Sequence, residues 1–234
     1  MMIPLTVTAT MTTGIAHSLP WGIALDGILA SALWYASKPA ATHIPALDAD
    51  NPPDLDLPLA RCLPPAGPWH WAATCSWPDP APIQPDVHYW TSRVDHRSFE
   101  HLTAALPKVI SDRQGRWKAH RMPLITYPCR TLTWSAVGDP DQIRALLATI
   151  PAIGKKRSQG EGQVLAWDVS PAPHLDAFTA AHLTPTGELG RPVPPACLID
   201  RHIATSGLGL AAIRPPSMHP SRLHELHLPA PVMS

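Results

Sequence analysis

The segment 153–169 combines glycines with three adjacent cations, reading I-G-K-K-R-S-Q-G-E-G-Q-V-L-A-W-D-V. Its glycines accept positive φ and let a ligand approach the backbone closely, because they carry no Cβ. Its cations add positive charge and hydrogen-bond donors. This chemistry suits a loop that holds the phosphate backbone of a nucleic acid. The candidate RNA-binding residues in this loop are Gly154, Lys155, Lys156, Arg157, Ser158, Gly160 and Gly162.

Two common phosphate-binding motifs do not fit this loop. In a nucleotide-binding P-loop the Gly-Lys pair is followed by Ser or Thr, whereas here Lys155 is followed by Lys156. In a dinucleotide-binding fingerprint the glycines follow a strand and open a helix, whereas here they precede a strand. The remaining alternative is a tight surface turn with solvated charges, which is common for basic runs.

The net charge is zero, but the charges are unevenly distributed along the chain. Residues 108–157 contain ten Lys and Arg against three Asp and Glu, whereas residues 1–107 contain four against nine. A basic block raises the local potential and supplies the contacts that dominate affinity for nucleic acids.

Within this block, the segment 113–121 surrounds one aromatic residue with cations and carries a glycine at position 115. This pattern is typical of a hairpin or thumb that follows a nucleic-acid strand and stacks a base. The alternative for its tryptophan is a place in the core. The candidate contacts are Arg113, Arg116, Trp117, Lys118 and Arg121.

Two strand-helix units position these loops. Residues 3–10 and 130–137 alternate between apolar and polar residues and predict strands. Helices are expected at 25–36, where the apolar period is 3.6 residues, and from Pro140, which follows the capping residue Asp139. Ser18 is a candidate cap for the first helix. The order predicts an α+β, ferredoxin-like β-α-β-β-α-β core with an insertion.

An early L-D-G-I-L-A helix at 25–30, combined with a late G-K-K-R-S-Q-G-E-G loop before a core strand, resembles the RAMP superfamily of CRISPR-associated proteins. Together with the R-P-P motif at 214–216, these features are most similar to the small subunit of type IV effector complexes that caps the 5′ handle of the guide RNA.

The resemblance implies a cytoplasmic, non-catalytic RNA-binding subunit whose glycine-rich loop holds the 5′ handle. Its partners would be the guide RNA, the repeating backbone subunits and a large subunit. A subunit of this kind can also contact target DNA near the protospacer-adjacent motif.

Two alternatives remain open. A guide-processing endoribonuclease of the same superfamily would need a general base, for which His17 is the candidate, and a cation such as Lys155 or Lys156 on the developing charge. His17 could instead bond a backbone carbonyl, and the sequence places no second His or Tyr beside it. A general RRM-like RNA-binding module is disfavoured, because no aromatic RNP motif is present.

Metal ligands are not grouped along the chain. The four cysteines, at positions 62, 75, 129 and 197, form no C-x-x-C pair, and the thirteen histidines show no H-x-x-x-H spacing. The pair His224 and His227 is weak evidence for a ligand. We therefore expect reduced thiols, no metal site and no other cofactor.

Thirty prolines concentrate in the stretches 39–85 and 171–229. Because each proline removes a backbone donor, these stretches should form neither long helices nor central strands. We expect extended segments that wrap the core, with disorder as the alternative. The expected organisation is a core at 1–170, insertions at about 39–130, and a C-terminal extension at 171–234 that packs on the core. The apolar stretch 19–36 includes Asp26 and fits a core helix better than a membrane span.

Overall fold

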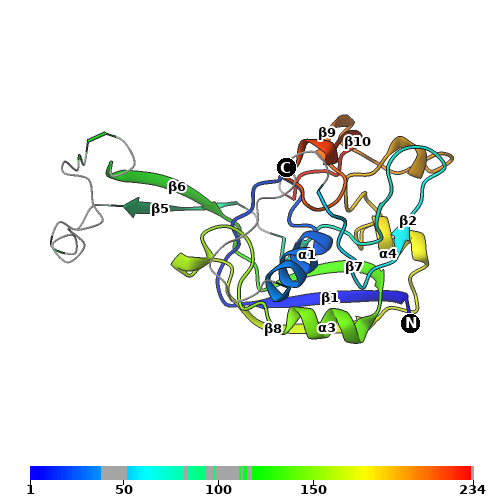
Figure 1. Ribbon diagram of the computed structural model, residues 1–234, viewed down its shortest axis with the longest axis horizontal. Coiled ribbons are helices and arrows are strands. Elements are labelled where there is room, and N and C mark those ends of the chain that lie inside the picture. The colour runs from blue at the N-terminus through cyan, green and yellow to red at the C-terminus, as the bar shows by residue number, and fades with distance from the viewer. Residues whose placement is uncertain are drawn as a thin grey trace.

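The structure, a computed structural model, describes residues 1–37, 52–81, 84–92, 97, 111, 113–114 and 118–232. These ranges contain α-helices, short 3₁₀ turns and antiparallel strands. The expectation of a fold that combines α-helices and β-strands is confirmed. Figure 1 shows a main body and a two-stranded arm that projects from it.

The central sheet has four strands in the order β4-β7-β1-β8, and every neighbouring pair is antiparallel. The strands are β1 (Ile3–Met11), β4 (Trp77–Asp79), β7 (Thr131–Gly138) and β8 (Val164–Pro171). The predicted strands at 3–10 and 130–137 are β1 and β7. Alternation along β1 explains its two faces, since Leu5, Val7 and Ala9 are fully buried while the threonines between them are partly exposed.

Two helices build the main core with this sheet. These are α1 (Leu25–Ala36) and α3 (Pro140–Leu147), which contact each other. Their apolar side chains and those of β1, β7 and β8 form one buried cluster around Trp134, which is fully buried. The indole of Trp134 donates a hydrogen bond of 2.7 Å to the carbonyl of Ile23, so its polar atom is satisfied inside the core.

The N-terminal caps of α1 and α3 can be compared with the caps predicted from the sequence. The side chain of Asp139 accepts hydrogen bonds from the amides of Asp141 and Gln142, which confirms the predicted cap of α3. The predicted cap of α1 was wrong, because α1 begins at Leu25, long after Ser18, and Ala24 at its N-cap makes no side-chain cap bond. The backbone between Ser18 and α1 forms turns and a bridge from Ala24 to Cys75 instead.

The C-terminal extension packs on the other side of the sheet. Its helix α4 (Ala177–His182) buries Ala180 and Ala181 against Val137, whose side chain points away from the α1 and α3 cluster. The extension continues with the 3₁₀ turn η4 (Pro195–Cys197) and with the antiparallel pair of β9 (Leu208–Ala212) and β10 (Leu223–His227). A further 3₁₀ turn, η5 (Pro220–Arg222), lies in the connection between these two strands. The proline-rich stretches thus form short elements and extended segments where they are described, as expected.

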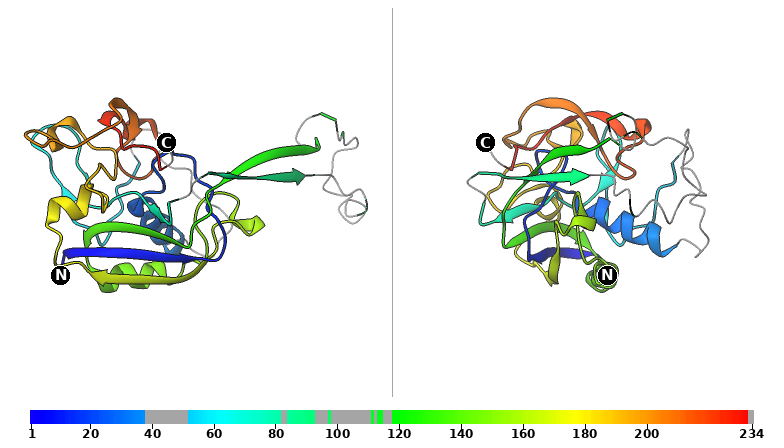
Figure 2. Two further views of the ribbon diagram at one scale, coloured as in Figure 1. Left: turned by 180° about the vertical axis from the view of Figure 1, so that it is seen from behind. Right: turned by 90° about the vertical axis from the view of Figure 1, so that its left-hand side faces the viewer.

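The inserted segments at about 39–130 contain two small pairs of strands. In one, β2 (Arg61–Cys62) pairs with β3 (His70–Trp71). In the other, β5 (Asp86–Ser92) pairs with β6 (His120–Thr126), and these two form the projecting arm, which the left view of Figure 2 shows from behind. None of the helices within the described ranges is long and apolar enough to cross a membrane.

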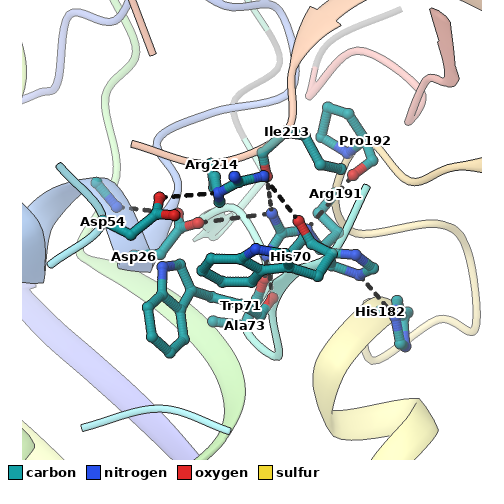
Figure 3. Close-up of polar contacts among 12 residues, drawn as sticks. Asp26, Asp54, His70, Trp71, Ala73, His182, Arg191, Pro192, Ile213 and Arg214 are labelled. Atoms are coloured by element: carbon teal, nitrogen blue, oxygen red, sulfur yellow. Dashed lines mark hydrogen bonds and ion pairs between the residues drawn. The ribbon is translucent and has the colours of Figure 1, made fainter. Parts of the chain in front are cut away.

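A buried arginine joins the extension to the core (Figure 3). Arg191 donates hydrogen bonds to the carbonyls of Trp71, Ala73, Pro192 and Ile213. Its guanidinium also lies 3.5 Å from the carboxylate of Asp26 on α1, and both side chains are at most 4% exposed. One side chain therefore ties α1, β3 and the extension together.

Candidate functional site

The glycine-rich loop adopts the conformation that its composition predicted. Gly154, Gly160 and Gly162 have φ values of 85°, 94° and 67°, and Lys156 is also left-handed at 57°. The 3₁₀ turn η3 (Arg157–Gln159) lies between Lys156 and Gly160. The loop thus needs glycine at three positions for its backbone path.

Several backbone amides of this loop bond to the protein rather than facing outward. Lys155 donates its amide to the carbonyl of Ala16 at 2.7 Å, and Gly162 donates to Gly14 at 3.0 Å. The amides of Lys156, Arg157 and Ser158 have no acceptor among the described residues. The backbone groups left for a ligand are therefore at the tip of the loop and not along its whole length.

The glycines differ in what surrounds them. A Cβ at Gly162 would lie 1.8 Å from the carbonyl oxygen of Ile153, a core residue, and one at Gly154 would lie 2.5 Å from the carbonyl oxygen of Ala16. A Cβ at Gly160 would meet nothing within 4 Å. The two ends of the loop are therefore packed against protein backbone, whereas Gly160 at its tip is open.

An open groove of about 950 Å³ separates the loop from α1. Lys155 and Arg157 lie on one wall, and small and apolar side chains of α1, such as Ala32 and Ile28, lie on the other. Lys155 and Arg157 are exposed, and neither forms an ion pair within the described part of the chain. The groove thus offers two uncompensated cations beside a wall of weakly polar surface.

The loop also contacts the base of the arm. The ammonium of Lys156 lies 3.6 Å from the centroid of the Trp90 ring, a cation–π contact. Glu161 lies 3.2 Å from Nδ1 of His88, and Asp86 lies 2.7 Å from Nε2 of the same ring. The sequence interpretation placed Lys156 on RNA, whereas the structure gives the side chains of Lys156 and Glu161 protein partners on β5.

The link between the loop and the arm includes a titratable group, His88. Hydrogen bonds from the His88 ring to Asp86 and Glu161 raise the pKa of His88, because both carboxylates stabilise the charged imidazolium. The ionic part of this contact is therefore present below that raised pKa and is lost as the pH rises through it.

The arm brings some of the predicted thumb residues to its surface. Arg121 on β6 stacks over the ring of Tyr89 on β5, with 4.3 Å between the guanidinium carbon and the ring centroid. Tyr89 remains 57% exposed. Arg113 and Lys118 lie in the irregular segment before β6. Arg116 and Trp117 lie outside the residues that the structure describes. The aromatic residues of β5, Tyr89 and Trp90, were missed as candidates because the sequence shows no cation next to them.

His17 lies at the mouth of the groove, and its ring stacks on Tyr127 with 4.5 Å between the centroids. Its Nδ1 is 2.6 Å from the carbonyl of Leu19, the bond that the sequence interpretation gave as the alternative to catalysis. Burial lowers the pKa of His17, the hydrogen bond to the Leu19 carbonyl opposes this shift, and the nearby charge of Lys155 adds to it. The ring is thus held neutral, and the bridge between Ile15 and Tyr127 brings it the aromatic partner that the sequence did not place there.

Four metal-ligating side chains meet in a second place, which corrects the expectation that the chain has no such cluster. The ligand atoms of Cys62, His70, His182 and Cys197 all lie within 4.8 Å of one another. The two rings approach to 3.0 Å between their Nε2 atoms (Figure 3). Local spacing rules missed the cluster because its members come from β2, β3, α4 and η4. His224 and His227 do not belong to it.

The two other motifs of the resemblance have structural partners. Asp26 of the L-D-G-I-L-A helix is the buried counter-ion of Arg191. Arg214 of the R-P-P motif pairs with Asp54 at 3.0 Å and lies over the ring of Trp69. Both motifs therefore hold the extension and the inserted segment on the core.

The chain matches no model of a known protein family and no curated protein.

Proposed function

We propose that this chain is a non-catalytic RNA-binding subunit of a type IV-like CRISPR effector complex and that it holds the 5′ handle of the guide RNA. The main observation in support of this proposal is the groove between α1 and the glycine-rich loop. It is open, and its loop wall presents Lys155, Arg157 and the unpaired amides at the loop tip. Exposed cations beside backbone donors are the groups that bind phosphates.

The sheet topology supports a ferredoxin-like RAMP core. Such a core has four antiparallel strands in which the first and third, by chain order, lie side by side at the centre. Here β1 and β7 are the central pair, β4 and β8 flank them, and α1 and α3 follow β1 and β7 in the chain. The glycine-rich loop then lies between the second helix and the last strand, as in the resemblance.

The arm supports a contact with a strand that leaves the groove. It projects from the body beside the loop and combines exposed Tyr89 with Arg121. Aromatic rings with adjacent cations follow single-stranded nucleic acid by stacking and by charge. In this proposal the arm reaches along the guide toward the neighbouring backbone subunit, and the assembly also contains a large subunit and contacts target DNA in the cytoplasm.

The proposal is tested by photocrosslinking the purified chain to repeat-derived RNA that carries 4-thiouridine in its 5′ handle. Crosslinked peptides mapped by mass spectrometry should come from the loop at 150–163 and from the arm strands β5 and β6. An RNA of equal length and unrelated sequence controls for non-specific contact. Crosslinks confined to the C-terminal extension or to the threonine face of the sheet would refute the groove as the binding site.

A second candidate function is the endoribonuclease, which the grouping of His17, Tyr127 and Lys155 favours. A neutral imidazole next to a cation can act as a general base whose developing charge has a neighbouring stabiliser. Because the Nδ1 atom of His17 bonds the Leu19 carbonyl, the Nε2 atom would accept the proton of the RNA 2′-hydroxyl.

We expect no cleavage when the chain is incubated with repeat-derived RNA, with or without a divalent metal, because the proposed subunit only binds. The measurement is the length distribution of end-labelled RNA on a denaturing gel. Metal-independent cleavage that disappears in His17→Ala but persists in His174→Ala, an exposed histidine outside the groove, would establish the enzyme instead.

A further inference from the structure

The four side chains of the second cluster have the composition of a tetrahedral metal site. Two thiols and two imidazoles, contributed by Cys62, Cys197, His70 and His182, converge within 4.8 Å. The cluster is independent of the groove and of the RNA-binding proposal, since no member lines the groove. We propose that these residues bind one Zn²⁺ ion, which fastens the C-terminal extension to the inserted segment.

The spacing of the ligand atoms fits zinc. Zinc–nitrogen bonds of about 2.0–2.1 Å at tetrahedral angles place two nitrogens about 3.3 Å apart, and zinc–sulfur bonds of about 2.3 Å place two sulfurs about 3.8 Å apart. The Nε2 atoms of His70 and His182 are 3.0 Å apart, and the other ligand atoms lie within the 4.8 Å limit of the cluster. An ion at the centre needs only small side-chain adjustments.

The hydrogen bonding of His182 prepares its ring for a metal. Its Nδ1 is 2.9 Å from the carbonyl of Phe178 and donates to it, which leaves the lone pair of Nε2 directed into the cluster. The ring of Phe178 stacks on that of His182 at 4.4 Å and restricts its rotation. Two facing imidazole nitrogens can share only one proton, whereas a metal ion between them satisfies both lone pairs.

Charge and burial favour a structural ion. His70 and His182 are 0% and 2% exposed, and Zn²⁺ with two thiolates and two neutral imidazoles has no net charge, so its burial carries a small electrostatic cost. Four protein ligands also complete the tetrahedron and leave no open position for a substrate. A tetrahedral set of two sulfurs and two nitrogens favours zinc over the oxygen-binding cations.

The ion would connect two distant parts of the chain. Cys62 and His70 are directly opposed residues of the β2–β3 pair, whereas His182 and Cys197 end α4 and η4 in the extension. The zinc site and the Arg191 network would then attach the extension at two separate points. Structural zinc sites contribute their binding free energy to folding, so the extension should loosen when the metal is removed.

The test is the metal content of the full-length chain, purified without a histidine tag and without chelators. We expect one equivalent of zinc by mass spectrometry of the metal, near-complete loss of zinc in Cys62→Ser and Cys197→Ser, and full retention in Cys129→Ser. Cys129 is the matched control because it is a partly buried thiol outside the cluster. Chelation should lower the melting temperature of the wild type and of Cys129→Ser.

The wild-type protein provides a second measurement in case the serine variants do not fold. Replacing zinc with Co²⁺ should produce the strong visible absorption of tetrahedral cobalt with thiolate ligands, and alkylation mapping should show Cys62 and Cys197 protected until the metal is removed. Purified wild type without bound metal, zinc that survives in both serine variants, or a Cys62–Cys197 disulfide in the native chain would overturn the proposal.

Discussion

Replacing Arg191 with Met should lower the free energy of unfolding by about 3–5 kcal/mol, because it breaks a buried ion pair by removing one partner. Methionine keeps much of the side-chain volume but leaves Asp26 without its counter-ion. It also removes the guanidinium donor from the carbonyls of Trp71, Ala73 and Ile213, of which that of Trp71 keeps a hydrogen bond from the amide of Ala73. A buried polar group that loses its partner costs desolvation energy, which adds to the cost of the broken ion pair.

The measurement is equilibrium unfolding in urea, with the Arg144→Met variant as the control. Arg144 is a half-exposed arginine on α3 that pairs with Asp141 at i, i+3 and donates one hydrogen bond to the carbonyl of Val169, so its loss should cost about 1–2 kcal/mol. If Arg191→Met is as stable as Arg144→Met, the Arg191 network does not hold the extension on the core.

The titration of Asp26 should make the stability of the protein depend on pH. Burial raises the pKa of Asp26, although Arg191 opposes that rise. A carboxyl group with a raised pKa in the folded state contributes stability at low pH and loses it as the pH rises through that value. Asp26→Asn should therefore remove this pH dependence and cost less at neutral pH than Asp26→Ala, which leaves a larger void.

The local elements could be predicted from the sequence because local physics determines them. The alternation in 3–10 and 130–137 and the cap at Asp139 each depend on neighbouring residues, and the structure forms β1, β7 and α3 there. The same holds for the left-handed glycines of the loop, since their positive φ is a property of the residue itself. Ser18 was a poor cap because a turn-rich segment separates it from α1.

The long-range partners could not be predicted, since nothing in local spacing encodes them. Cys62 and His70 are eight residues apart and meet across two short strands, while His182 and Cys197 come from a segment more than a hundred residues later. Both proline-rich stretches contain Cys and His, but the first offers two of each and the second offers one Cys with six His, so composition alone does not single out these four residues.

The partners of the charged loop residues could not be predicted from the sequence either. The sequence identifies Lys155, Lys156 and Arg157 as equivalent cations, but only the fold distinguishes Lys156, which lies on Trp90, from the two that face the groove. Glu161 likewise finds His88 only because the arm starts beside the loop. These assignments depend on the placement of β5, which the sequence did not reveal.

The largest expected effect on RNA follows from these cations. Replacing Lys155, Lys156 and Arg157 together with Ala should weaken binding of repeat-derived RNA by roughly an order of magnitude or more at moderate salt. Each phosphate contact on a single strand contributes about 0.7 to the slope of log affinity against log salt, so losing the Lys155 and Arg157 contacts should reduce the slope by about 1.4, with a smaller contribution from Lys156. Lys156→Ala alone should reduce the slope less than Lys155→Ala or Arg157→Ala, because its ammonium already has an aromatic partner.

The salt dependence of RNA affinity in the triple variant therefore tests the RNA-binding site most directly. It is measured by fluorescence anisotropy over a salt series, with Arg144→Ala as a control that removes a cation outside the groove. The proposal predicts a lower slope and weaker binding in the triple variant and wild-type values in Arg144→Ala. An unchanged affinity and an unchanged slope in the triple variant would contradict the groove as an RNA-binding site and would leave the loop as a structural turn.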